Sequence, residues 1–274
     1  MAENTDELKK VKLELNKVIL TGTITEDFAY HHSTKGANIY KSFISVKRDS
    51  GTDDVLPIMV SEKILKEVFS PTKKKTYISQ SYTVCVEGIM ASYNEHIENG
   101  KSKLILFVKP NNILIVADDT KPNNNIELTG YIVKAVNVRK TPGLKDKKGV
   151  RIKQERLIAD VMLGVNINVN KHSVSYYIPC IFWGKAASAI GKLGIGTQIN
   201  IHGRVQSRKY NKKYENGNIE EKVAYEISVA DTLVIGKNGE VSNLVKVEPK
   251  KPVKEKRNKV TVKTKHNPNG FNLD

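Results

Sequence analysis

The sequence is poor in several residues and patterns on which common protein classes depend. Its 274 residues include two cysteines and one tryptophan, and 29 Asp and Glu stand against 45 Lys and Arg, a formal charge of +16. No apolar run approaches the ~18 residues that a membrane-spanning helix needs. The opening segment MAENTDELKKVKLELNK is charged where a signal peptide would be apolar. We therefore expect a soluble cytoplasmic protein with no membrane partner.

Cysteine is too scarce for a disulfide framework. Cys85 and Cys180 each lie in an alternating apolar stretch, and neither has a second Cys or a His at a metal-binding spacing. The adjacent His31 and His32 would point to opposite faces of a strand or lie in a loop, which makes a poor metal site. We expect two buried strand thiols, no metal site and no cofactor.

The acidic residues form no catalytic pattern either. Asp53 and Asp54 belong to a Gly-Thr-Asp-Asp turn sequence, and Asp118 and Asp119 lie between the two halves of the chain, so turn chemistry accounts for both pairs. The sequence has no Ser/His/Asp arrangement and no glycine loop of the kind that cradles phosphate. It therefore predicts a binding protein rather than an enzyme.

An internal repeat is the most informative feature that is present. Residues 20–24, LTGTI, recur as residues 128–132, LTGYI, an offset of 108 residues. Residues 93–100, YNEHIENG, match residues 210–217, YNKKYENG, at five of eight positions. In each copy this second motif follows an alternating run that ends in glycine, at Gly88 in the first copy and at Gly203 in the second. A tandem duplication predicts two copies of one fold.

Each copy has mainly the pattern of β-strands. Period-two alternation predicts strands at residues 82–88 and 197–203, each followed by a Glu-Asn-Gly hairpin turn. Further alternating segments lie at residues 103–108, 113–116, 222–229 and 233–235. One short helix is predicted in each copy, at residues 61–69 with Ser61 as a possible N-cap and at residues 185–192.

Five strands with a helix between the third and fourth describe a Greek-key barrel of the oligonucleotide/oligosaccharide-binding (OB) type, although this pattern alone also fits an SH3-like barrel or a sandwich. We predict an all-β chain of two tandem five-stranded OB barrels, each with one short helix. The predicted parts are an N-terminal extension (1–14), a divergent first domain (15–117), a second domain (118–236) and a disordered basic tail (237–274).

Motifs in the second copy carry a resemblance to a known family. They are residues 125–130 (NIELTG), 178–187 (IPCIFWGKAA), 196–197 (GT) and, most specific, 203–210 (GRVQSRKY). Together these resemble the bacterial single-stranded DNA-binding protein family. The first copy is similar more loosely, through residues 20–22 and 40–48 and Gly88. It has Val60-Ser61 where the family has Trp-Gly, and no arginine between Gly88 and Tyr93.

The resemblance implies a non-enzymatic protein that coats unwound single-stranded DNA without regard to sequence, in replication, recombination or repair, in a chromosomal, plasmid or phage setting. It also implies four OB domains around the strand, so that two-domain chains would form a homodimer, and a nucleoid-associated location. Family chains end in an acidic tip that recruits replication and repair enzymes, whereas this tail has a net charge of +6. An assembly or adaptor module with a nucleic-acid-binding tail, and an RNA-binding protein, remain alternatives.

Binding single strands requires flat aromatic surfaces for bases and cations for phosphates. Trp183 follows Phe182 on a predicted strand, so that one ring faces the core and the other the surface, and we predict Trp183 as the stacking platform. A basic loop at residues 139–153 joins the first two strands of this copy. The candidate nucleic-acid-binding residues are Trp183, Arg139, Lys140, Lys147, Lys148, Arg151, Lys153, Arg156, Lys185, Arg204, Arg208, Lys209, Tyr210, Lys212, Lys213 and Tyr214. Weaker candidates in the first copy are Phe28, Tyr30 and Lys35, which we expect in the loop equivalent to residues 139–153, and Tyr93.

The excess positive charge is unevenly distributed along the chain. Residues 1–117 carry 16 Lys and Arg and 14 Asp and Glu, a net charge of +2. Residues 118–236 carry 19 and 11, a net of +8, and residues 237–274 carry 10 and 4, a net of +6. A polyanionic partner is therefore expected at the second copy and the tail.

Overall fold

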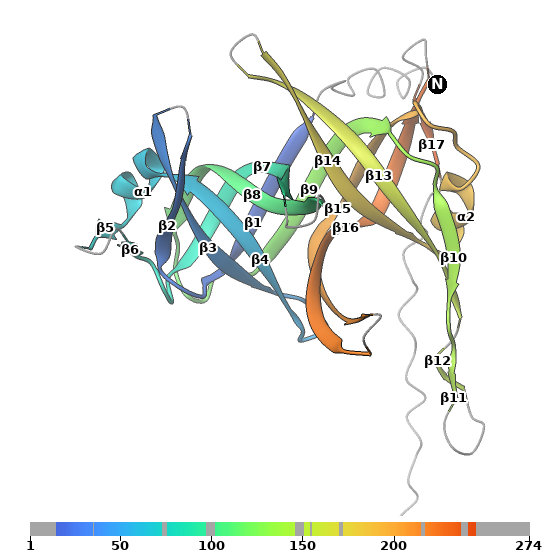
Figure 1. Cartoon of the computed structure of the whole chain (residues 1–274), viewed down its shortest axis with the longest axis horizontal. Helices are drawn as coiled ribbons and strands as arrows, with labels where there is room; N and C mark the ends of the chain where they lie inside the picture. The colour runs from blue at the N-terminus through green and yellow to red at the C-terminus, as the bar shows by residue number, and fades with distance from the viewer. Residues whose placement is uncertain are drawn as a thin grey trace, which may run out of the picture.

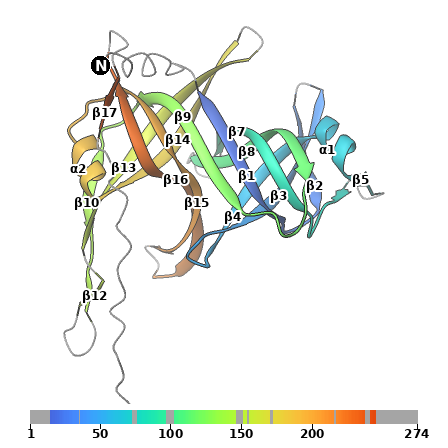
Figure 2. The ribbon, with the colours of Figure 1, turned by 180° about the vertical axis from the view of Figure 1, so that it is seen from behind.

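Two β-barrels lie next to each other along the long axis of the molecule (Figure 1). The structure is a computed structural model that describes residues 15–34, 36–72, 76–96, 102–145, 151–153, 155–169, 172–214, 217–236 and 241–244. Figure 2 shows from behind that the first barrel (blue to cyan) and the second (green to orange) meet along two neighbouring strands, β1 and β9.

The first barrel is a closed circuit of five strands. They pair in the order β1–β3–β4–β8–β7–β1, with β4 and β8 parallel and the other neighbours antiparallel. The strands are β1 (Asn16–Ile24), β3 (Ala37–Lys47), β4 (Asp53–Ser61), β7 (Thr83–His96) and β8 (Ser102–Ile115). Helix α1 (Glu62–Val68) lies between β4 and β7 in the chain and begins after Ser61, which occupies the N-cap position as predicted.

The second barrel repeats this circuit. Its strands pair in the order β9–β13–β14–β16–β15–β9, and β14 runs parallel to β16. They are β9 (Asn123–Ile132), β13 (Arg156–Val169), β14 (His172–Trp183), β15 (Gln198–Lys213) and β16 (Ile219–Ile235), with helix α2 (Gly184–Ile190) after β14. The prediction of two tandem OB barrels with one short helix each is confirmed. Neither helix is long enough to cross a membrane, and no other helix occurs in the described part of the chain.

Strands of the first barrel that lie outside its five-strand circuit correct one prediction. Residues 28–35 were expected in a loop, but β2 (Phe28–Thr34) forms a hairpin with β3 and also pairs with β6 (Thr76–Ile78), which pairs with β5 (Ser70–Pro71). Phe28 is 0% exposed and packs against Phe69, with ring centroids 5.9 Å apart. A buried ring offers no face to a base, so Phe28 is a core residue and not a stacking residue.

The second barrel has its own additions. Strand β10 (Asn137–Thr141) pairs with β13, and β11 (Leu144–Lys145) pairs with β12 (Arg151–Lys153) in an arm that projects from the barrel (Figure 1). The predicted tail also begins too early, because β17 (Val241–Asn243) pairs with β16 and Leu244 packs on the core. The rest of the tail and the N-terminal extension lie outside the described residues.

The glycine of the repeated Leu-Thr-Gly motif is required for the same steric reason in both barrels. Strand β1 pairs with β7 as far as Thr23, and Thr23 and Ile24 pair with β3. A Cβ atom on Gly22 would lie 2.2 Å from the carbonyl oxygen of Ser45, and one on Gly130 would lie 2.6 Å from that of Gly164. Only glycine allows the first strand of each barrel to approach its second partner this closely.

The two barrels are joined by an antiparallel pairing of β1 with β9. Val18 lies opposite Ile126, and Asn16 and Leu20 lie opposite Leu128 and Asn124. Because the repeat offset is 108 residues, exchanging the two strands leaves this register unchanged, so the pairing has pseudo-twofold symmetry. Both central side chains are fully buried, so the junction continues the hydrophobic core.

Two asparagines tie this junction to the fourth strands of both barrels. The Asn16 Nδ2 donates to the Met90 carbonyl and its Oδ1 accepts from the Met90 N–H, both at 2.8 Å. The Asn124 amide makes the same two bonds to Val205, at 2.7 and 2.9 Å. Each asparagine thus bonds the main chain as a neighbouring strand would, and the same pair of bonds occurs on each side of the junction.

An asymmetric ion cluster adds to this junction. Asp54 was assigned to a turn, but it lies in β4, is 0% exposed and binds Arg48 in its own barrel. From the second barrel, the Arg204 Nη1 donates to its Oδ2 at 2.9 Å and the Ser207 N–H to its Oδ1 at 2.8 Å. Turn chemistry therefore does not account for Asp54, which bridges the barrels.

Replacing Asp54 tests this bridge. Asp54→Asn removes the charge between two partly buried arginines and should lower the free energy of unfolding by about 2 kcal/mol. Urea titration measures the change, and Asp53→Asn, at the exposed neighbour, is the matched control and should change it little. Equal stabilities for the two variants would show that Asp54 does not hold the barrels together.

Candidate nucleic-acid interface

Trp183 lies on the surface at the end of β14. Its indole is 38% exposed and its Nε1 donates to the Ser228 Oγ at 3.2 Å, whereas Phe182 is fully buried. The alternation along the strand therefore places these two rings as predicted, one outward and one in the core. The hydrogen bond holds the indole against β16 and leaves part of the ring accessible.

Strand β15 continues the surface on which Trp183 lies. Arg204 is opposite Ser228 in the ladder, and the register runs unbroken from Gly203 to Lys213. Alternate residues therefore share one side of the β15–β16 hairpin with Trp183. We call this surface the hairpin face, and define it by Trp183, Arg204, Gln206, Arg208, Tyr210, Lys212, Tyr214, Glu220, Lys222, Glu226 and Ser228.

The inner part of the hairpin face is a hydrogen-bonded network. The Gln206 Nε2 donates to the Glu226 Oε1 at 2.7 Å, and the Arg208 Nε donates to the same oxygen at 3.2 Å. The Arg204 Nη2 donates to the Gln206 Oε1 at 3.0 Å. Burial and the nearby Arg48 lower the pKa of Arg204, although a guanidinium stays charged. These arginines are therefore held in fixed positions by acidic and amide partners.

The outer part of the hairpin face combines aromatic rings with lysines. Tyr210 is 38% exposed and has the Arg208 guanidinium 5.7 Å from its ring centroid. The ammonium groups of Lys212 and Lys222 lie 5.0 and 5.5 Å from the centroid of Tyr214. Lys222 was not predicted as a site residue, and its position opposite Tyr210 follows from pairing the hairpin about its Glu-Asn-Gly turn.

Two of the predicted lysines lie on the other side of the hairpin. Lys209 is opposite Val223, and Lys213 is opposite Ile219. The Lys209 ammonium lies 2.9 Å from the Glu221 carboxylate, and this hydrogen bond raises the lysine pKa. The basic run 208–213 is thus divided between two faces, and only Arg208 and Lys212 share a face with Trp183.

The projecting arm carries the second predicted basic group. Arg139 in β10 donates from Nε to the Asp160 Oδ2 at 2.7 Å, and this hydrogen bond raises the arginine pKa. Lys140, Arg156 and, at the start of α2, Lys185 have exposed side chains. Arg151 and Lys153 lie in β12, and their side chains are not described. Lys147, Lys148 and, in the first barrel, Lys35 lie outside the described residues.

The corresponding face of the first barrel has different chemistry. The β-bulges next to Gly88 and Gly203 align β7 with β15. In this register Tyr93 is equivalent to Arg208. The repeated Tyr-Asn in the sequence had aligned Tyr93 with Tyr210, two residues further along the strand. Tyr93 packs edge-on against Phe107, with centroids 5.9 Å apart, and burial raises its pKa. Tyr30, 43% exposed, lies on β2 with its ring against Tyr40.

The two adjacent histidines correct another expectation. A β-bulge between Tyr30 and His32 places both imidazoles on one side of β2, with their Nδ1 atoms 2.7 Å apart. Burial, His32 and Lys41 lower the pKa of His31, against a smaller effect of Glu95. Within the described ranges, no group of three or more His, Cys, Asp and Glu side chains is placed to hold a metal ion.

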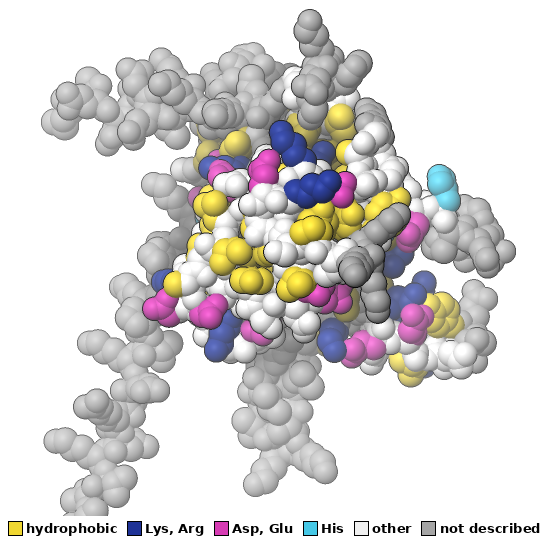
Figure 3. All heavy atoms as spheres, turned by 90° about the vertical axis from the view of Figure 1, so that its left-hand side faces the viewer, with side chains coloured by type: hydrophobic (Ala, Val, Ile, Leu, Met, Phe, Trp, Pro, Cys, Tyr) yellow, Lys and Arg dark blue, Asp and Glu magenta, His cyan; other side chains and the backbone are white. Residues whose placement is uncertain are grey.

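Charge on the first barrel is balanced rather than concentrated. Figure 3, which looks at the end of the molecule formed by this barrel, shows Lys and Arg interspersed with Asp and Glu and with hydrophobic side chains. This agrees with the net charge of +2 of residues 1–117. The electrostatic attraction for a polyanion is therefore weaker here than at the second barrel.

Comparison with known proteins supports the motif analysis. Residues 123–234 match the model of the single-strand binding protein family. The match begins at β9 and ends within β16, so it covers the second barrel, including the hairpin face. A search of curated proteins finds no significant match.

Solved structures extend the likeness to both barrels. A deletion and substitution variant of the single-stranded DNA binding protein from Thermus aquaticus covers 86% of this chain and 97% of its own, with 16% identity and a TM-score of 0.51. The wild-type protein covers 80% of this chain and 91% of its own, with 16% identity and a TM-score of 0.53. At this identity the likeness establishes the fold, and its extent exceeds either barrel alone.

Proposed function

We propose that the chain binds single-stranded DNA without regard to sequence and protects it during replication, recombination or repair, starting from the match of the second barrel to the single-strand binding protein family. The observation that carries the proposal is the hairpin face, where an exposed indole, two tyrosines and several cations share one surface. Bases stack on the rings and phosphates meet the cations between them. This action is binding, without a catalytic step.

The arrangement on the hairpin face supports binding that ignores sequence. Every base has a flat π face, so stacking on Trp183 and Tyr210 accepts any of them. Arg208 is oriented by Glu226, which lowers its conformational freedom before a phosphate arrives. RNA is the alternative ligand, because an aromatic platform does not distinguish the sugar.

Trp183 provides the central test. Trp183→Ala should weaken oligo(dT) binding by about 5- to 150-fold, because each stacked base contributes about 1–3 kcal/mol. Fluorescence anisotropy of a labelled oligomer measures the affinity, with oligo(rU) as the RNA comparison. Quenching of the chain's only tryptophan on binding gives a second readout.

Nucleic-acid binding by the basic tail would mask the loss of affinity on Trp183→Ala, so the tail is removed in a second experiment. A fragment of residues 1–244 retains β17 and Leu244, which packs on the core, and removes the remaining tail. We expect this fragment to bind oligo(dT) and to lose affinity on Trp183→Ala as the full chain does. A fragment that no longer binds would show that the tail, and not the barrels, holds the nucleic acid.

Two neighbouring lysines test which side of the hairpin meets the strand. Lys212 lies on the hairpin face and Lys213 on the opposite side, and both are exposed. Lys212→Ala should weaken binding and reduce the dependence of log K on log salt by about 0.7, the value for one phosphate contact with a single strand. Lys213→Ala is the matched control, and an equal effect of both variants would contradict a binding surface confined to one side.

We also propose that two chains associate. The family resemblance implies four OB domains around the strand, and one chain supplies two, joined by the pseudo-twofold pairing of β1 and β9. Sedimentation equilibrium of the full chain should give about 61 kDa, twice the chain mass of 30.6 kDa. A mass of about 31 kDa at concentrations where DNA is bound would rule out the dimer.

A further inference from the structure

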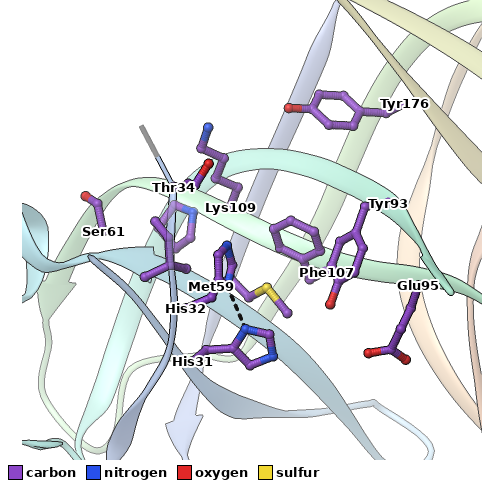
Figure 4. Close-up of a pocket in the computed structure, with 12 residues that line it drawn as sticks. His31, His32, Thr34, Met59, Ser61, Tyr93, Glu95, Phe107, Lys109 and Tyr176 are labelled. Atoms are coloured by element: carbon purple, nitrogen blue, oxygen red, sulfur yellow. Dashed lines mark hydrogen bonds between the residues drawn. The ribbon is translucent and has the colours of Figure 1, made fainter. Parts of the chain in front are cut away.

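The first barrel has a pocket of about 530 Å³ on the side that corresponds to the hairpin face (Figure 4). This volume lies in the range of sites for small molecules, about 300–1,000 Å³. Strands β2, β3, β4, β7 and β8 form its walls, and one residue comes from β14 of the second barrel. Its principal side chains are His31, His32, Met59, Tyr93, Phe107 and Tyr176.

The walls of the pocket suit a flat heteroaromatic ring. Figure 4 shows Tyr93 and Phe107 on one side and the paired imidazoles on another, with the Met59 thioether between them. Met59 is nearly fully buried and forms part of the floor. Aromatic rings and a polarizable thioether contact planar π systems favourably, and a few polar groups at the rim can orient such a ligand.

The equivalence of the barrels explains why the first has a hollow. Aligned through the bulge glycines, Tyr93 and Phe107 stand where the second barrel has Arg208 and Glu226. The residue that precedes the helix is Ser61 in the first barrel and Trp183 in the second. The second barrel therefore covers this site with an indole and an ion pair, whereas the first leaves an open space lined with rings.

We propose that this pocket accepts one unstacked base of the bound single strand. The inference rests on the proposed function and adds to it a second kind of contact, in which a base enters a pocket of the first barrel as well as stacking on the second. Tyr176 reaches the pocket from the second barrel, so the site is complete only when the two barrels are docked. An aromatic pocket needs little net charge, which fits the nearly neutral first barrel.

Filling the pocket is the most direct test. The Ser61 hydroxyl makes no hydrogen bond to the helix that it caps, and the second barrel has tryptophan at the equivalent position. Ser61→Trp should therefore fold normally and occupy the space. We expect Ser61→Trp and Tyr93→Ala to weaken binding of a long oligo(dT), about 35 nucleotides, by about 5- to 150-fold. An oligomer of about 8 nucleotides, within the size that one OB barrel holds, should bind the second barrel with unchanged affinity.

Cross-linking provides a readout that does not depend on affinity. Oligo(dT) with a single 5-iodouracil should cross-link on irradiation to peptides containing Tyr93, Phe107 or the two histidines, and Ser61→Trp should abolish these products. Thermal unfolding of each variant is the folding control, and Trp183→Ala is the control for the second barrel.

The outcomes separate this inference from the proposed function. Unchanged or tighter binding of the long oligomer by Ser61→Trp, with cross-links confined to the second barrel, would overturn the pocket while leaving strand binding intact. Equal weakening for both oligomer lengths in a folded Ser61→Trp chain would also overturn it. If the unaltered chain binds neither oligomer, the proposed function fails and the inference fails with it.

Discussion

The antiparallel pairing of β1 with β9 is the contact on which the rest of the structure depends. It converts two barrels into one continuous sheet, with Val18 opposite Ile126 at the centre and an asparagine on each side bonded to a fourth strand. Because this junction holds the two barrels together, β4 of the first barrel contacts β15 of the second, and β14 of the second contacts β7 of the first. The Val55 N–H then donates to the Ser207 Oγ at 3.1 Å, and the Tyr177 N–H donates to the Ser92 Oγ at 2.9 Å. These two bonds occupy equivalent positions in the repeat, so the symmetry extends beyond the junction itself.

The symmetry of the backbone is not shared by the side chains that surround the junction. On one side Asp54 draws Arg48 and Arg204 together, which fixes Arg204 within the hairpin face. On the other side the position equivalent to Asp54 is Tyr176, which contributes to the wall of the pocket in the first barrel. One duplicated backbone thus carries a charged, aromatic surface on one barrel and a ring-lined hollow on the other. A bound strand would meet a platform in one place and a pocket in the other.

Much of the fold could be predicted from local patterns, because alternation and turn chemistry act over a few residues. The repeat predicted two barrels, and the Phe182-Trp183 pair was assigned correctly to core and surface. The errors arose where distant segments meet. Residues 28–34 carry loop-like polar residues, but the ring of Phe28 packs against Phe69 and the segment becomes a strand. Asp54 follows a turn sequence, but its partners Arg204 and Ser207 are 150 and 153 residues away.

The candidate site shows the same division between local and distant information. The sequence by itself determined the tandem repeat, the strand pattern of each copy, the concentration of positive charge in the second half and the aromatic and basic residues of the hairpin, because each of these is a local feature. It predicted the OB fold only when the family motifs were added to that pattern. Only the tertiary structure decided that Lys212 shares a face with Trp183 while Lys213 does not, that Phe28 is buried, and that the first barrel has a pocket completed by Tyr176. These features depend on strand register, on bulges and on the docking of one barrel against the other, and contacts of that range leave no local signal in the sequence.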